Sequence, residues 1–209
     1  MSVKDRRKRE TLHMRQAIVK AAWDIAAEYG WQAVTLRKVA DKIEYSPAAL
    51  YEYFCSKEAI LLELMKEGFL LLTQQMRSVP EEITGVERLI AVAHSYWAFA
   101  FRHPELYQVM HGLDGVSFGT VETPQEARDG FIVLRDAVRG AMPADNESES
   151  ELYDEVDMFW AMLHGLVSLT MSKRIKGGKD RAVTLVEPAI AIYVAEWQKP
   201  RCPMAKGER

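Results

Sequence analysis

Apolar residues recur every three or four positions along most of this 209-residue chain. This spacing is typical of amphipathic α-helices, and we find no segment with the alternation that predicts a β-strand. The pattern predicts nine helices, at residues 11–29, 36–43, 47–54, 56–79, 84–102, 105–111, 124–141, 148–175 and 180–197. Pro188 falls inside the last of these, and it either kinks that helix or marks a later start. We therefore predict an all-α fold, with a three-helix head followed by a helical body.

The segment at residues 35–58 carries the strongest signals for helix ends. Thr35 and Ser46 each precede a short apolar-periodic stretch, where a hydroxyl can accept hydrogen bonds from the free N–H groups of a first helical turn. Pro47 occupies the first position of the second stretch, where a helix requires no N–H donor. Two short helices joined by a tight turn form a helix-turn-helix, whose second helix enters the DNA major groove.

The same segment resembles the DNA-binding signature of the tetracycline-repressor (TetR) family. Family members carry T-h-R-x-h-A, a turn, and then S-x-x-x-L-Y-x-[HY]-F-x-S-K-E, where h is an apolar residue. The matching positions in this chain are Thr35, Leu36, Arg37, Val39, Ala40, Ser46, Leu50, Tyr51, Tyr53, Phe54, Ser56, Lys57 and Glu58. The family usually has Gly in place of Glu44 and often has Gly in place of Ala48. Because Gly favours a positive φ, a non-Gly residue in the turn costs on the order of 1 kcal/mol.

The resemblance implies that residues 47–54 form the recognition helix of a DNA-binding head. Ala and Pro side chains can contact thymine methyl groups, and a Tyr hydroxyl can donate to a phosphate or a base edge. Thr35, Tyr53 and Lys57 match the phosphate-contact positions of the family. The full set of predicted DNA contacts is Thr35, Arg37, Ser46, Pro47, Ala48, Ala49, Tyr51, Tyr53 and Lys57. The alternative is that the capping residues serve only as helix caps.

In the body, the segment at residues 160–166 resembles the W-x-x-x-H-G motif of one subgroup of TetR ligand-binding domains. Aromatic side chains with a few polar tips suit a pocket for an apolar or aromatic small molecule. The candidate lining residues are Trp97, Phe101, Tyr107, Met110, His111, Phe131, Trp160 and His164. Ordinary core packing is the alternative for each of them. The histidines do not have the spacing of zinc ligands, so we expect neither a metal nor a cofactor.

Charge is unevenly distributed along the chain, although its net value is only −3. Residues 1–58 hold 11 Lys and Arg against 8 Asp and Glu, and the remainder holds 16 against 22. A basic head on an acidic body is typical of a nucleic-acid-binding module joined to a domain that does not touch phosphate. The basic stretch 1–10 is predicted to be a flexible arm, which reaches phosphate or the minor groove or is only a solubilising tail.

The bulk composition favours a cytoplasmic protein. We find no run of 18 apolar residues and no apolar segment of a secretory signal, so we expect no membrane span. Two cysteines are too few for a disulfide framework, and we expect Cys55 to be a small packing residue. Motifs of catalysis such as HExxH and GxSxG are absent from the sequence, which favours a protein that is not an enzyme.

The predicted segments are an arm at 1–10, a helix-turn-helix domain at 11–57, a ligand-binding and dimerisation domain at 58–200, and a polar tail at 201–209. The helix predicted at 148–175 has two apolar stripes, which indicates one surface inside the subunit and one against a partner. The resemblance then implies a homodimeric repressor, released from a palindromic double-stranded DNA operator by a small-molecule effector. An activator is the alternative within this class. The alternative from another class is an all-α small-molecule-binding protein or enzyme whose head no longer binds an operator.

Overall fold

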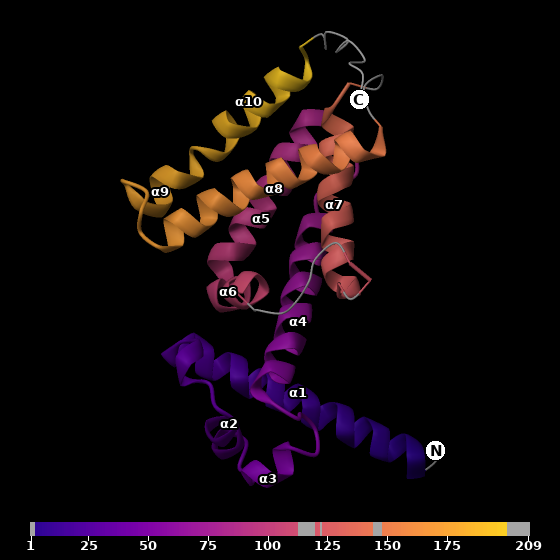
Figure 1. Cartoon of the computed structure of the whole chain (residues 1–209), viewed down its shortest axis with the longest axis vertical. Coiled ribbons are helices and arrows are strands. Elements are labelled where there is room, and N and C mark those ends of the chain that lie inside the picture. The colour runs from indigo at the N-terminus through magenta and orange to yellow at the C-terminus, as the bar shows by residue number, and fades with distance from the viewer. Residues whose placement is uncertain (1–2, 113–119, 122, 144–147, 200–209) are drawn as a thin grey trace, which may run out of the picture. The chain divides into compact units, whose positions relative to one another are not determined.

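The computed structural model describes residues 3–112, 120, 121, 123–143 and 148–199. Within this part, the chain forms α-helices and one short 3-10 turn, η1 (Trp31–Ala33), without a strand, so the predicted all-α fold is confirmed. The predicted tail at 201–209 lies outside the described residues. Figure 1 shows the helices, which are α1 (Val3–Tyr29), α2 (Leu36–Lys42), α3 (Pro47–Leu50), α4 (Lys57–Arg77), α5 (Gly85–Arg102), α6 (Pro104–Gly112), α7 (Gln125–Ala141), α8 (Glu149–Met171), α9 (Gly178–Val183) and α10 (Val186–Trp197).

The last predicted helix is divided into α9 and α10. The backbone N–H of Ala189 donates to the carbonyl of Leu185 at 3.1 Å, near the start of α10. Pro188 therefore lies in the first turn, where a backbone N–H would have no partner inside the helix. Of the two alternatives for Pro188, the later start is the one that the structure adopts.

The chain packs into two compact units. The first comprises residues 1–73 and 99–130, and the second comprises residues 74–98 and 131–209. Helices α4, α5 and α7 contribute residues to both units. The predicted domain boundary after residue 57 concerns the helix-turn-helix, and it stays a prediction. None of the described helices is both long and apolar enough to cross a lipid bilayer.

The first unit is built around the apolar face of α1. Ile18, Ala22 and Ile25 are buried on this face, because their spacing of three and four residues places them on one side of the helix. Helix α1 contacts η1, α2 and α6. The indole N–H of Trp31 donates to the carbonyl of Glu105 at 3.0 Å, which ties η1 to the start of α6.

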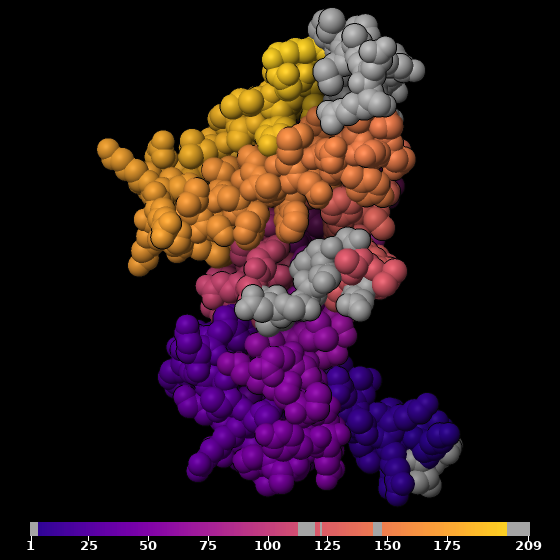
Figure 2. Space-filling model, viewed as in Figure 1, coloured from indigo at the N-terminus to yellow at the C-terminus, as the bar shows by residue number. Residues whose placement is uncertain are grey.

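The N-terminal basic stretch is helical from Val3, so the prediction of a flexible arm is wrong for residues 3–10. Lys, Arg and Glu are good helix formers, and Arg6 and Glu10 form an ion pair of 3.4 Å across one helical turn. Every residue from Lys4 to His13 is exposed. Figures 1 and 2 show this end of α1 projecting beyond the rest of the first unit.

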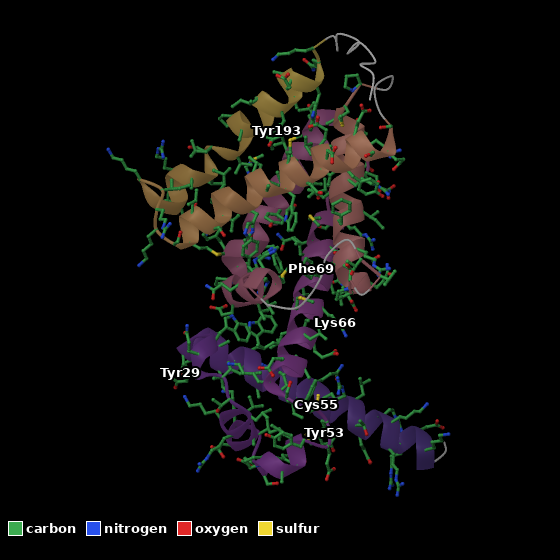
Figure 3. The ribbon with its side chains drawn as sticks, viewed as in Figure 1. Tyr29, Tyr53, Cys55, Lys66, Phe69 and Tyr193 are labelled. Atoms are coloured by element: carbon green, nitrogen blue, oxygen red, sulfur yellow. The ribbon has the colours of Figure 1, made fainter. Side chains whose placement is uncertain are left out.

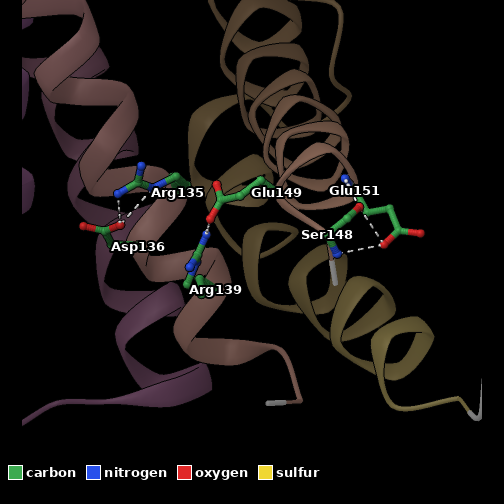
Figure 4. A network of polar contacts seen from close by, with 6 residues as sticks. All are labelled: Arg135, Asp136, Arg139, Ser148, Glu149 and Glu151. Carbon is green, nitrogen blue, oxygen red and sulfur yellow. Dashed lines mark hydrogen bonds and ion pairs between the residues drawn. The ribbon is translucent and has the colours of Figure 1, made fainter. Parts of the chain in front are cut away.

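In the second unit, α8 packs against α9 and α10. Its buried stripe consists of Leu152, Val156, Phe159, Leu163 and Val167. At its start, the Ser148 hydroxyl accepts from the Glu151 N–H at 3.4 Å, and the Glu151 carboxylate accepts from the Ser148 N–H at 3.1 Å (Figure 4). Arg139 of α7 forms an ion pair of 2.5 Å with Glu149 in the same turn. These contacts fix where α8 begins.

Candidate nucleic-acid interface and effector site

The helix caps predicted for the head are present. The Thr35 hydroxyl accepts from the N–H of Lys38 at 3.2 Å, and the Ser46 hydroxyl accepts from the N–H of Ala49 at 3.2 Å. A cap of this kind stabilises a helix by about 0.5–2 kcal/mol. Helices α2 and α3 contact each other, so the capped pair forms the expected helix-turn-helix.

The turn between α2 and α3 contains one residue in the left-handed conformation, at the position where the TetR family usually has Gly. Glu44 has a φ of 60°, which is strained for a residue with a Cβ atom. The N–H of Tyr45 donates to the carbonyl of Ala40 at 3.0 Å, which closes the end of α2. The turn therefore forms with Glu44 in place of Gly, and this lowers the folding stability by an amount on the order of 1 kcal/mol.

The recognition helix is shorter than the predicted stretch 47–54. Regular α-helix is limited to α3, and residues 51–53 continue as a turn. Leu50 is only 1% exposed, whereas Tyr51 is 59% exposed. Pro47 and Ala48 are exposed as well, so a small apolar face and one tyrosine are open to a partner.

Arg15 of α1 holds the end of the recognition segment, a role that the sequence analysis missed. Its guanidinium donates to the carbonyl of Tyr53 at 2.5 Å and lies 4.0 Å from the centre of the Phe54 ring. It also forms an ion pair of 3.5 Å with Glu63 of α4. Figure 3 shows Tyr53 and Cys55 beside α1, near the start of α4. These three interactions explain how the segment after α3 keeps its position despite its short helix.

Lys57 has a structural contact that the family pattern does not reveal. Its ammonium donates to the carbonyl of Trp31 at 3.1 Å. Since Trp31 also donates to Glu105, one residue links the start of α4 to the start of α6 inside the first unit. Lys57 retains N–H donors for a phosphate, because an ammonium has three of them.

The predicted DNA contacts differ in exposure, and all belong to the first unit. The exposed members are Thr35, Arg37, Ser46, Pro47, Ala48 and Tyr51, and the partly buried members are Ala49, Tyr53 and Lys57. Cys55, which we expected to be a packing residue, is exposed. The expectation for Cys55 is therefore wrong, because residue 55 lies on the surface between the buried residues Phe54 and Ile60.

The predicted effector site is divided between the two units. Phe101, Tyr107, Met110 and His111 belong to the first unit, and Trp97, Phe131, Trp160 and His164 belong to the second. In the first unit, the ring of His111 lies 4.5 Å from that of Tyr107 and 6.1 Å from that of Phe69. A common lining made by both groups stays a prediction.

In the second unit, Trp160 is a polar anchor as well as an aromatic surface. Its indole N–H donates to the hydroxyl of Tyr96 at 3.2 Å, and its ring lies 6.3 Å from that of His164. Nε2 of His164 is 3.3 Å from the Ser168 hydroxyl. Burial lowers the pKa of His164, which favours the neutral ring. Tyr96 was missed because Trp97 and Phe101 were the candidate lining residues chosen from this helix.

The fold and the capped pair α2–α3 define a helix-turn-helix protein with a helical body. Residues 18–64 match the family model described as bacterial regulatory proteins, tetR family, and residues 89–192 match the tetracyclin repressor-like C-terminal domain. The chain belongs to the TetR family of transcriptional regulators, which is not a family of enzymes. Membership of the W-x-x-x-H-G subgroup stays a prediction.

Relatives with similar sequences match only part of the chain. The uncharacterized HTH-type transcriptional regulator YobS of Bacillus subtilis is 33% identical over 91 residues, or 44% of this chain and 48% of YobS. The nicotine-responsive repressor HdnoR of Paenarthrobacter nicotinovorans is 30% identical over 92 residues, or 42% of this chain and 46% of HdnoR. The nucleoid occlusion factor SlmA of Vibrio campbellii is 32% identical over 102 residues, or 47% and 51%. The chain thus spans about half the length of these relatives.

Solved structures support the fold over most of the chain. A protein of unknown function from Rhodococcus sp. RHA1 has a TM-score of 0.73 at 22% identity, covering 88% of this chain and 95% of that one. FadR from Bacillus subtilis, in complex with stearoyl-CoA, has a TM-score of 0.63 at 19% identity, covering 86% and 97%. At these identities the likeness concerns the fold alone.

Proposed function

We propose that this protein is a ligand-responsive DNA-binding transcriptional regulator of the cytoplasm. It acts as a repressor, bound as a homodimer to a palindromic operator and released by a small apolar or aromatic molecule. The observation that carries the proposal is the exposed face of the head, where Pro47, Ala48 and Tyr51 are open on a segment whose ends are capped and anchored. Such a face suits base edges in a major groove, where apolar side chains contact thymine methyl groups.

Exposed basic side chains belong to the same unit as this face. Arg37, Lys38 and Lys42 of α2 are exposed, and so is the basic N-terminal part of α1. Contacts of Arg and Lys with phosphate supply affinity that is independent of sequence and falls with salt. The position of these groups on the head, and not on the acidic body, supports DNA as the partner.

Release by an effector requires a link between the body and the head. In the first unit, α6 contains the candidate residues Tyr107, Met110 and His111, and its Glu105 carbonyl accepts from Trp31. Trp31 in turn accepts from Lys57 at the start of α4. A ligand that displaces α6 would shift the population of head positions, and two heads fit successive major grooves only about 34–36 Å apart. The name of HdnoR, a nicotine-responsive repressor, supports a small molecule as the signal.

The test is selection of DNA from a random pool, followed by affinity measurements at several salt concentrations. We expect a palindromic consensus, and Arg37→Ala should reduce the salt slope by about two units, because each of the two heads loses one phosphate contact. Arg77→Ala is the matched control, because Arg77 is exposed but lies in the second unit. Absence of salt-dependent DNA binding in the wild-type protein would overturn the proposal and favour the small-molecule-binding alternative.

A further inference from the structure

A dense group of basic residues occupies the turn between α8 and α9 and the start of α9. Residues 173–181 hold five Lys and Arg against one Asp, whereas the rest of residues 59–209 holds 11 Lys and Arg against 21 Asp and Glu. We call residues 173–181 the basic turn. Its cations are all exposed, and they are Lys173, Arg174, Lys176, Lys179 and Arg181. Figure 1 shows the turn at the end of α8, and Figure 2 shows side chains projecting there.

The backbone of the basic turn is held by contacts of its own. The N–H of Arg174 donates to the carbonyl of Leu169 at 2.8 Å, which closes the end of α8. The guanidinium of Arg181 donates to the carbonyl of Lys176 at 3.2 Å. A Cβ atom added at Gly177 would lie 2.9 Å from Cβ of Arg181, so the Arg181 side chain crosses directly over Gly177. The turn therefore presents its other cations from a defined backbone.

The charges of the basic turn are not neutralised within the described part of the chain. Lys173, Arg174 and Lys176 form no ion pair with any described residue. Asp180, the one acid of the turn, forms no ion pair with a described residue either. Like charges held in one turn repel one another, so the binding of a polyanion relieves a repulsion that the fold itself does not.

The composition of the basic turn narrows the class of partner. The segment has no aromatic residue, and its only large apolar residue, Ile175, is partly buried. Protein partners and single-stranded nucleic acids are bound largely through aromatic and apolar side chains. An anionic membrane requires an apolar face that inserts between the headgroups. The backbone of a duplex requires only cations, because it presents a dense row of phosphates.

We propose that the basic turn binds the phosphate backbone of double-stranded DNA independently of sequence. Lys173 and Lys176 are three positions apart, so their Cα atoms lie at most about 11 Å from each other. One strand places about three phosphates along that length of the duplex axis. Lys173, Arg174 and Lys176 can therefore each contact a phosphate within the same stretch of backbone.

This site goes beyond the helix-turn-helix, because it lies on the second unit and requires neither a palindrome nor an effector. It differs from the expectation that the body does not touch phosphate. The acidic residues elsewhere on the body repel a duplex, so the contact is confined to the basic turn. A regulator with such a site holds DNA at two places on one chain, and the second place adds affinity that falls steeply with salt.

Acetylation of lysine ammonium groups in the full chain, measured by mass spectrometry, tests this proposal. We expect a short duplex of random sequence to protect Lys173 and Lys176 at low salt. Lys199 is the internal control, because it belongs to the second unit and its ammonium pairs with Glu196 outside the turn. Three phosphate contacts predict that the DNA concentration for half-protection rises about 40-fold between about 50 and about 200 mM salt, since log K falls by about 0.9 per contact for each decade of salt.

A pair of double variants identifies the cations that bind. Arg174→Gln combined with Lys176→Gln removes two of the three contacts and keeps Lys173 as the reporter, so its half-protecting DNA concentration should rise roughly tenfold or more at low salt. Arg77→Gln combined with Lys199→Gln removes the same charge from the second unit outside the turn, and it should leave that concentration unchanged. Thermal unfolding of both variants checks that each retains the fold.

Three outcomes would overturn the proposal. They are a Lys173 that the duplex does not protect, equal protection by single-stranded DNA or by inorganic phosphate, and a control variant that loses as much protection as the turn variant. Lys38 of α2 is exposed and reports the head in the same spectra. Protection of Lys38 without Lys173 would refute the basic turn alone, whereas protection of Lys173 without Lys38 would count against the proposed function alone.

Discussion

Substitution of Arg15 by Ala is the sharpest test of how the head is held together. The change removes a charged hydrogen bond of 2.5 Å to the Tyr53 carbonyl, a cation–π contact of 4.0 Å with Phe54 and an ion pair of 3.5 Å with Glu63. All three connect α1 to the segment between α3 and α4, so we expect local loosening of that segment ahead of the rest of the unit.

The magnitude follows from the exposure of each contact. A hydrogen bond to a charged group contributes about 1.5–3 kcal/mol, and a partly exposed cation–π contact contributes about 0.5–1 kcal/mol. The Arg15 and Glu63 side chains are each 36% exposed, so solvent screening keeps the ion pair below about 1 kcal/mol. Because the contacts share one side chain and are not additive, we expect a loss of about 2–4 kcal/mol.

Hydrogen exchange of peptides spanning residues 47–60 measures this loss as a reduced free energy of local opening. Glu63→Gln is the control. It removes the ion pairs of Glu63 with Arg15 and with Lys66 but leaves the other two Arg15 contacts, and it should change the opening free energy by less than about 1 kcal/mol. Arg15→Lys keeps the charge but not the planar guanidinium, and it should give an intermediate value. If Arg15→Ala changes local opening by less than about 1 kcal/mol, the three contacts do not anchor the recognition segment.

Three further predictions concern contacts described above. Lys57→Ala should weaken DNA binding across all sequences and flatten the salt slope by about two units in a titration, since both heads lose a contact. Trp31→Phe retains the Lys57 ammonium and should leave the slope unchanged. If the Trp160 ring lines a pocket, Trp160→Ala should lower the effector response and leave DNA affinity unchanged. If the ring is only core, the variant should lose roughly 3–5 kcal/mol of unfolding free energy in denaturant, and both activities should fall. Tyr96→Phe is the control, because it removes only the hydrogen bond to Trp160. Burial lowers the pKa of His103, so the unfolded chain binds a proton at this residue more readily than the folded chain does. The melting temperature should therefore fall as the pH falls below 6.5, and it should fall less steeply in His103→Gln.

The parts of the head that depend on neighbours in sequence could be predicted. Thr35 and Ser46 cap helices that start one residue later, and hydroxyl-to-N–H bonds of this kind span only three residues. The positive φ of Glu44 was indicated by the Gly that the TetR family usually has at this position, and not by the residues around it. The helical state of residues 3–10 was also a local property, and the prediction failed there because charge was given more weight than helix propensity.

Contacts between distant residues could not be predicted from periodicity. Arg15 and Tyr53 are 38 positions apart, Tyr96 and Trp160 are 64 apart, and Trp31 and Glu105 are 74 apart. The spacing of apolar residues reveals which face of a helix is buried, but it does not say which polar groups meet when two faces pack. This explains why the sequence placed the DNA-contact residues on one head yet missed the residue that anchors them.

The hydrogen bonds of Trp31 can be compared in energy with the coupling that an allosteric response requires. Coupling between an effector and a DNA site amounts to about 1–3 kcal/mol. A neutral hydrogen bond contributes about 0.5–1.5 kcal/mol, and one from a charged donor such as Lys57 contributes about 1.5–3 kcal/mol. The two bonds at Trp31, to Glu105 and from Lys57, therefore cover the whole range that is required. A displacement of α6 that broke either hydrogen bond would change the free energy of the head by as much as a typical effector does, without further rearrangement of the core.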